Sequence, residues 1–230
     1  RRRLKKLLFE QLRLDVIRVG IEMLEKGLTI GTGGNISARC PDGEHFLITP
    51  SGMPYHTLKP EDIVMVNQAT GEMEGPRKPS IEIHLHWKTY LARPDVGGIV
   101  HVHSPIASAL AAARKPLPVI LDVCAFNFRG QVEVAEYGMS GSVELAENVV
   151  KALGQRNAVL MANHGSLAVG KNVDVALDRC ELLEKASHAY LLSQLVGGAV
   201  ALSQETIDSL LSGVGKTYGQ QPAPGGDKKA

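Results

Sequence analysis

Two histidines separated by one residue end a short apolar segment, Ile99-Val100-His101-Val102-His103. Alternate side chains of an extended strand point to the same face, so His101 and His103 are expected to lie side by side. A third histidine, His164, follows a second apolar segment at residues 158–162. Two strand ends that carry imidazoles can offer three nitrogens to one divalent cation, which is the ligand set of a catalytic zinc site with an open position. The alternative is that they are polar residues placed where buried strands meet solvent.

Three loop segments offer groups suited to binding an anion. Residues 31–37 combine three glycines, whose backbone N–H groups can approach a ligand closely, with the polar side chains of Asn35 and Ser37. The others are residues 49–52 (Thr-Pro-Ser-Gly) and 78–82 (Lys-Pro-Ser-Ile-Glu). Ser80 stands at the expected start of a helix, where N–H groups favour phosphate. Each segment alone could be an ordinary cap or turn, but three beside a possible metal site favour a phosphorylated substrate.

Glu82 is expected in the first turn of the helix that begins near Ser80. It is either a stabilising first-turn acid or a metal ligand that becomes a base once substrate displaces it. His86 shares a helix face with Glu82 at i,i+4 and is a possible neighbour of the site. The remaining histidines are interpreted as packing, surface or structural residues: His84, His45, His56 and His188.

The elements that must position these residues follow from apolar periodicity and from glycine and proline. Helices are expected at about residues 4–26, 80–91, 106–113, 142–153, 174–195 and 204–211, with a helical turn at 57–62. Strands are expected at 35–39, 46–49, 63–66, 99–103, 132–134 and just before His164. Strands outnumber those of a simple βαβ alternation, so we expect an α/β fold with a mixed, mostly antiparallel central sheet and helices on both faces. One domain should span residues 1–219, and the Pro-, Gly- and Lys-rich residues 220–230 should be a disordered tail.

Composition excludes several function classes. The chain has 230 residues with 25 basic and 24 acidic side chains, and its only dense basic run is at residues 1–6, which argues against a nucleic-acid surface. No apolar stretch is long enough to span a bilayer, and no signal-peptide pattern opens the chain. The three widely spaced cysteines are typical of free thiols in a reducing cytoplasm.

Taken in series, the segments GTGGNIS, ITPSGMPY, PSIE, HVHSP and NHG resemble the class II aldolase/adducin family, in particular its fuculose-phosphate and ribulose-phosphate aldolases. The resemblance extends from the first helix to residues 216–219. It implies a cyclic homotetramer and a zinc ion bound by His101, His103 and His164, with Glu82 both binding the metal and moving a proton. Manganese, cobalt or iron would also suit imidazole ligands. The phosphate-binding positions that it implies are Gly34, Asn35, Ser51, Gly52 and Ser80.

The chain departs from the family pattern at two positions. Ser80-Ile81 replaces a Ser-Ser pair that often precedes the glutamate, so one hydroxyl is lost. Asp122 stands where the microbial fuculose-phosphate aldolase places a tyrosine acid, and the alternative for Asp122 is a solvated loop acid. Tyr218 matches a family tyrosine that can reach a neighbouring subunit's site, and its alternative role is subunit packing.

The resemblance therefore implies metal-dependent, reversible cleavage of a ketose 1-phosphate, similar to L-fuculose 1-phosphate or a 5-deoxy-pentulose 1-phosphate, to dihydroxyacetone phosphate and an aldehyde. Three alternatives remain open at this point. Two are other chemistries of the same family, a 5-methylthioribulose-1-phosphate dehydratase and a decarboxylase. The third is a non-catalytic, adducin-like binding module, although such modules characteristically lack the three histidines.

Overall fold

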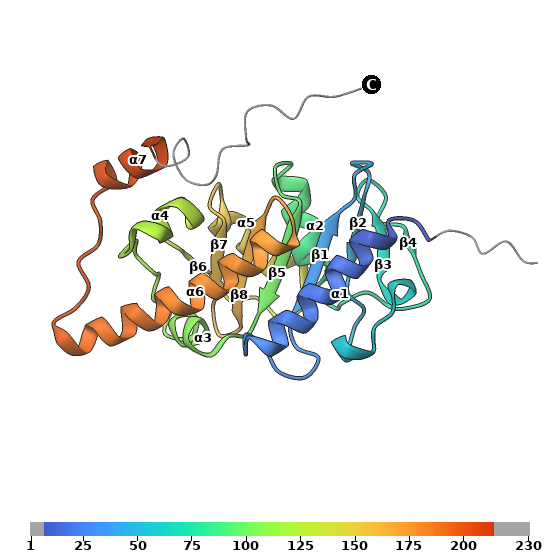
Figure 1. Cartoon of the computed structure of the whole chain (residues 1–230), viewed down its shortest axis with the longest axis horizontal. Coiled ribbons are helices and arrows are strands. Elements are labelled where there is room, and N and C mark those ends of the chain that lie inside the picture. The colour runs from blue at the N-terminus through green and yellow to red at the C-terminus, as the bar shows by residue number, and fades with distance from the viewer. Residues whose placement is uncertain (1–6, 214–230) are drawn as a thin grey trace, which may run out of the picture.

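A mixed β-sheet runs through the computed structural model, which describes residues 7–213 (Figure 1). Within these residues the eight strands follow the order β4-β3-β2-β1-β5-β8-β7-β6. Every neighbouring pair is antiparallel except β6 and β7, which are parallel. The mixed, mostly antiparallel sheet expected from the sequence is therefore confirmed. The strands are β1 (Asn35–Arg39), β2 (His45–Ile48), β3 (Val64–Asn67), β4 (Met73–Glu74), β5 (Gly98–Val102), β6 (Val134–Ala135), β7 (Ala158–Met161) and β8 (Gly165–Gly170).

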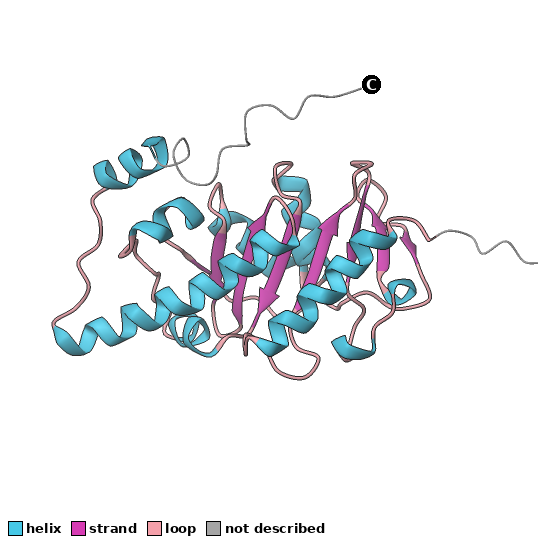
Figure 2. Cartoon of the chain, in the orientation of Figure 1, coloured by secondary structure: helices cyan, strands magenta, loops and turns pink. Residues whose placement is uncertain are grey.

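Helices cover both faces of this sheet, as predicted (Figures 1 and 2). One apolar cluster joins α1 (Glu10–Glu25), α3 (Pro105–Ala112) and α6 (Val173–Ser193) to the sheet, and a second joins α2 (Ile83–Ala92) and α5 (Val143–Leu153). Successive strand residues alternate between the clusters, since Val100 lies in the first and Ile99 in the second. Both faces of β5 are thus buried, which holds the residues at its end in fixed positions.

The remaining helices lie at the periphery. α4 (Asp122–Phe128) packs against α7 (Gln204–Gly213), and short 3-10 turns occupy η1 (Tyr55–Thr57), η2 (Pro60–Asp62) and η3 (Gln194–Val196). Three described elements were not expected from the sequence: α4, the two-residue strand β4, and β8. The last is an apolar segment with glycine at both ends, and its local pattern resembles a turn more than a strand.

The strand β8 decides where His164 lies. It pairs with β5 on one side and with β7 on the other, and residues 162–164 form the turn that joins β7 to β8. Asn163 adopts a left-handed conformation in this turn, with φ of 56°, which asparagine tolerates better than most residues. The hairpin therefore delivers His164 to the end of β5 that carries the other two histidines.

One expectation needs correction, and others cannot be compared. The second helix begins at Ile83, with Glu82 at its N-cap, so Glu82 is not in its first turn and Ser80 is not its cap. Asp122, for which a solvated loop acid was the alternative interpretation, is an exposed residue at the start of α4. Residues 1–6, Tyr218 and the expected tail 220–230 lie outside the described residues. In the described part of the chain, no helix combines the length and apolar character needed to cross a membrane.

Candidate active site

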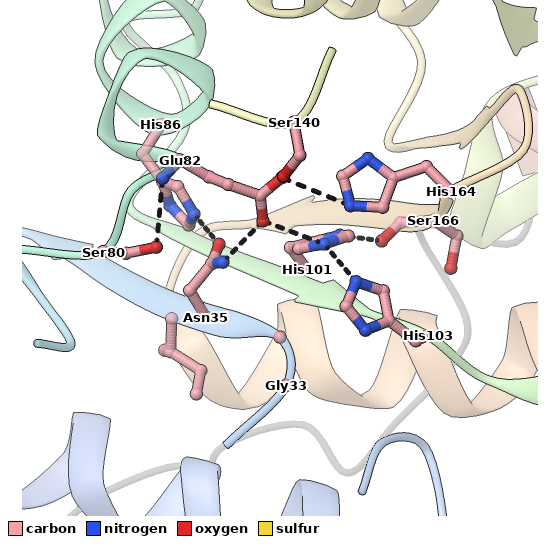
Figure 3. Close-up of polar contacts among 12 residues, drawn as sticks. Gly33, Asn35, Ser80, Glu82, His86, His101, His103, Ser140, His164 and Ser166 are labelled. Atoms are coloured by element: carbon pink, nitrogen blue, oxygen red, sulfur yellow. Dashed lines mark hydrogen bonds and ion pairs between the residues drawn. The ribbon is translucent and has the colours of Figure 1, made fainter. Parts of the chain in front are cut away.

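Three histidines converge where β5 and the β7–β8 turn end (Figure 3). The Nε2 atoms of His101 and His103 are 2.9 Å apart, so the prediction that these side chains share a face is confirmed. One ring nitrogen from each of His101, His103 and His164 lies within 4.8 Å of the others. His101 is fully buried, whereas His103 and His164 are partly accessible. The cluster therefore has a closed side, toward the sheet, and a side that a ligand can approach.

Hydrogen bonding orients the His101 ring. Its Nδ1 donates to the carbonyl oxygen of Ser166 at 2.8 Å, so Nε2 is the nitrogen that this ring offers to the cluster. This Nε2 faces the Nε2 atom of His103 and a carboxylate oxygen of Glu82, which is 3.1 Å away. Burial, followed by the charges of His101 and His164, lowers the pKa of His103 to about 4, so this ring is neutral at pH 7. Neutral imidazole nitrogens and a carboxylate facing one another fit a divalent cation.

Glu82 is held at the centre of the cluster by four neighbours. Its Oε2 accepts a hydrogen bond from the amide of Asn35 at 2.8 Å, and its Oε1 accepts one from the Ser140 hydroxyl at 3.0 Å. Its Oε1 also lies 3.2 Å from Nε2 of His164. Burial opposes the charged form, but His101 and His164 outweigh it and hold the pKa of Glu82 well below its usual range. The group is therefore a carboxylate at neutral pH, as a metal ligand must be.

A chain of buried hydrogen bonds extends behind Glu82, and Figure 3 shows its first two members, Asn35 and His86. Because the Asn35 amide nitrogen donates to the carboxylate, its oxygen must accept from His86 Nε2, at 2.5 Å. His86 then accepts on Nδ1 from the Ser37 hydroxyl at 2.6 Å, and Ser37 accepts from Tyr90 at 2.9 Å. Burial lowers the pKa of His86 to about 3 and keeps the ring neutral. Every donor in this chain therefore points toward the carboxylate.

Two of the predicted anion-binding segments lie against each other. Pro50 and Pro79 form an isolated bridge between them, the Ser51 N–H donates to the Lys78 carbonyl, and the Ser80 N–H donates to the Thr49 carbonyl. The Ser80 hydroxyl accepts from the backbone N–H of Glu82 at 3.2 Å. The segments that contain Ser51, Gly52 and Ser80 are thus joined beside the residue that contacts the histidines.

The remaining predicted segment, residues 31–37, packs directly against the histidines through Gly33 and Gly34. Gly34 has φ of +71°, and a Cβ atom built there would lie 2.5 Å from the His101 carbonyl oxygen. A Cβ atom on Gly33 would lie 3.2 Å from Nδ1 of His103. Asn35 then pairs with His101 across the β1–β5 register. Glycine is required here because the backbone passes too close to the histidines for a side chain.

Several residues that the sequence singled out lie elsewhere or were missed. Asp122 is exposed at the start of α4, and within residues 7–213 no hydrogen bond or ion pair joins it to Glu82 or the histidines. Ser140, which contacts Glu82, was not predicted, since it lies in the loop before α5 in a segment without a recognisable motif. The other histidines are not in the cluster: His84 stacks on Trp87, His45 contacts Asp42, and His56 and His188 are exposed.

The same arrangement of segments occurs in known proteins. The family model for the Class II Aldolase and Adducin N-terminal domain matches residues 14–191. A 5-deoxy-D-ribulose 1-phosphate aldolase of Bacillus thuringiensis serovar kurstaki is 34% identical over 215 residues, which is 94% of this chain and 100% of that protein. A 5-methylthioribulose-1-phosphate/5-deoxyribulose-1-phosphate aldolase of Rhodospirillum rubrum is 34% identical over 216 residues, covering 93% of this chain and 96% of that protein.

Solved structures give the same result. An L-fuculose 1-phosphate aldolase structure superimposes with a TM-score of 0.85 at 36% sequence identity, covering 88% of this chain and 95% of that one. The residues matched by the family model, 14–191, include the three histidines and the three anion-binding segments. The chain belongs to the class II aldolase and adducin family.

Proposed function

We propose that this protein is a zinc-dependent aldolase that reversibly cleaves a ketose 1-phosphate to dihydroxyacetone phosphate and an aldehyde. The observation that carries the proposal is the convergence of three imidazole nitrogens and the Glu82 carboxylate beside the three anion-binding segments. Retention of all three histidines argues against an adducin-like binding module. The names of the relatives favour a 5-deoxypentulose 1-phosphate or L-fuculose 1-phosphate as substrate.

His101, His103 and His164 would hold the zinc ion, with Glu82 as a further ligand before substrate binds. Manganese, cobalt or iron could take the same place, since imidazole suits each of them. When bound, the ion supplies Lewis acidity that polarises the ketose carbonyl and stabilises the negative charge left by carbon–carbon cleavage. Glu82 would move the proton at C3 of the dihydroxyacetone phosphate half. Its hydrogen bonds from Asn35 and Ser140 would keep it oriented while it does so.

The substrate phosphate would lie on Gly34, Asn35, Ser51, Gly52 and Ser80. One N–H of the Asn35 amide is committed to Glu82, which leaves the second for an outside acceptor. Holding the phosphate there fixes the reacting carbons next to the histidines, which lowers the entropic part of the barrier. Tyr218 or Asp122, contributed by a neighbouring subunit of a homotetramer, would act as the acid at the aldehyde oxygen. We place the enzyme in the cytoplasm, and its three buried, unpaired cysteines are consistent with a reducing compartment.

The test is a coupled assay for dihydroxyacetone phosphate release. The substrates are L-fuculose 1-phosphate, L-ribulose 1-phosphate and 5-deoxyribulose 1-phosphate, each with and without a chelator and with metal added back. We expect release that the chelator abolishes and that zinc restores. If the metal-loaded protein released no dihydroxyacetone phosphate from any of them, the dehydratase and decarboxylase alternatives would replace this proposal.

A further inference from the structure

A second cluster of charged residues lies at the end of the sheet opposite the histidines. We call it the arginine pocket, a concavity of about 430 Å³ whose charged lining residues are Arg93, Asp95, Arg129, Lys171 and Arg179. Gly170, at the end of β8, also lines it, whereas His164 precedes the start of the same strand. Gly170 is six residues beyond His164, which is roughly 20 Å at the usual rise of a strand. The arginine pocket is therefore distinct from the candidate active site.

The pocket contains more positive than negative charge. Arg93 donates from Nε and Nη2 to the two carboxylate oxygens of Asp95, at 2.7 and 2.8 Å, and from Nη1 to the carbonyls of Gly154 and Arg156. The only acid of the pocket is thus committed to an arginine whose other donors serve the backbone. Among the described residues, no ion pair engages the other three cations, which are Arg129, Lys171 and Arg179. Three positive charges therefore face one concavity without internal compensation.

Arg179 adds a second, independent observation. Its Nη1 donates to the Val169 carbonyl at 2.6 Å, but its buried Nε has no hydrogen-bond partner within the described residues. Burial lowers the pKa of this guanidinium, and the charges of Arg129 and Arg93 lower it further. Like charges gathered around a partly buried guanidinium are unfavourable unless an anion in the pocket compensates them. Planar guanidinium groups match the geometry of phosphate oxygens particularly well.

We propose that the arginine pocket binds a polyanionic, phosphate-bearing small molecule at a site separate from the aldolase substrate. The three uncompensated cations supply the charge, and the pocket volume accommodates an anion larger than inorganic phosphate. Occupation of the pocket would link the segment between α2 and β5, the end of β8 and α6, which all contribute residues to it. The bound anion would therefore stabilise the fold without taking part in the reaction.

The test is titration calorimetry of the full, metal-loaded chain at constant ionic strength. The probes are inorganic phosphate and 2,3-bisphosphoglycerate, and thermal unfolding is followed with each. The test variant combines Arg129→Asn with Lys171→Gln. Asparagine tolerates the left-handed backbone at position 129, where φ is 63°, and Lys171 is exposed. The matched control is Lys59→Gln, an exposed lysine outside the pocket.

We expect 2,3-bisphosphoglycerate to bind the wild-type chain and to raise its unfolding temperature. The double variant should lose about tenfold or more in affinity, because two charged partners are removed, while Lys59→Gln should not differ from wild type. Equal binding by wild type and double variant would overturn the proposal. A change in the mass of the assembly in the double variant, measured by light scattering, would also overturn it, since the cations would then serve contacts between copies. Aldolase activity, assayed on the same samples, reports on the other site.

Discussion

The buried hydrogen-bond chain behind Glu82 makes His86 a positioning residue, and this role can be measured. Replacing His86 with leucine keeps a similar volume but removes the donor to Asn35 and the acceptor for Ser37. The Asn35 amide is then no longer fixed with its nitrogen toward the carboxylate. A hydrogen bond to a charged group contributes about 1.5–3 kcal/mol, so losing the one from Asn35 to Glu82 should lower kcat/KM about 10- to 150-fold.

The assay compares His86→Leu, Asn35→Leu and the double variant in dihydroxyacetone phosphate release at saturating metal. If His86 acts through Asn35, Asn35→Leu should lose at least as much kcat/KM as His86→Leu, because it also removes the N–H offered to the substrate phosphate. The double variant should then be little worse than Asn35→Leu alone. Zinc per protomer and the thermal unfolding midpoint are measured on each sample. His188→Leu, which changes an exposed histidine outside the cluster, is the control.

The fold will also be affected, because His86→Leu leaves the buried Asn35 oxygen without a donor and the Ser37 hydroxyl with Tyr90 as its remaining partner, at a cost of about 1–3 kcal/mol. Tyr90→Phe is the milder variant, since it removes only the outermost donor of the chain. We expect it to lose about 1 kcal/mol of stability and less than about threefold in kcat/KM. Wild-type kcat/KM in a folded His86→Leu, alongside an impaired Asn35→Leu, would refute the positioning role. Full additivity in the double variant would refute it as well.

Three further predictions concern the metal, the loop before α5 and the pH dependence of stability. His101→Ala should lose zinc and activity yet unfold cooperatively, as mass spectrometry and circular dichroism can check, whereas an unfolded variant would indicate a structural metal. Ser140→Ala should lower kcat only about three- to tenfold, with zinc content unchanged, because Ser140 is exposed and water can replace its hydroxyl at Glu82. Burial opposes the charged form of Asp62, but hydrogen bonds from the Arg77 side chain and the backbone hold its pKa below the usual value. The stabilisation from the Asp62 carboxylate is thus full above about pH 4 and lost as pH falls through the lowered pKa. In urea unfolding, Asp62→Asn should be less stable than wild type at pH 7, and the difference should shrink as the pH is lowered.

Local sequence patterns were sufficient for the parts of the site that depend on one element. The two-residue spacing of His101 and His103 placed both rings together because strand periodicity alone determines it. The i,i+4 spacing of Glu82 and His86 likewise placed both against Asn35. The contact of Ser140 with Glu82 depends on a loop 58 residues away in sequence, and no local pattern reports such a contact. The hairpin that carries His164 was predicted only in part. Its first strand was expected, but β8 was not, because β8 begins and ends with glycine.

The directions of the hydrogen bonds that end at Glu82 explain why a cation fits between this carboxylate and the histidines. Along the chain from Tyr90 to Asn35, each acceptor receives a donor, and the direction of each hydrogen bond follows from the one before it. Glu82 ends this chain as an acceptor on both oxygens. His101, with its Nδ1 proton given to the Ser166 carbonyl, points Nε2 at that same carboxylate, 3.1 Å away. A carboxylate oxygen and an imidazole nitrogen buried this close need a positive charge between them, either a proton or a metal ion. Only a divalent ion can also take the nitrogens of His103 and His164 as ligands, so the hydrogen-bond network that orients Glu82 also favours metal binding.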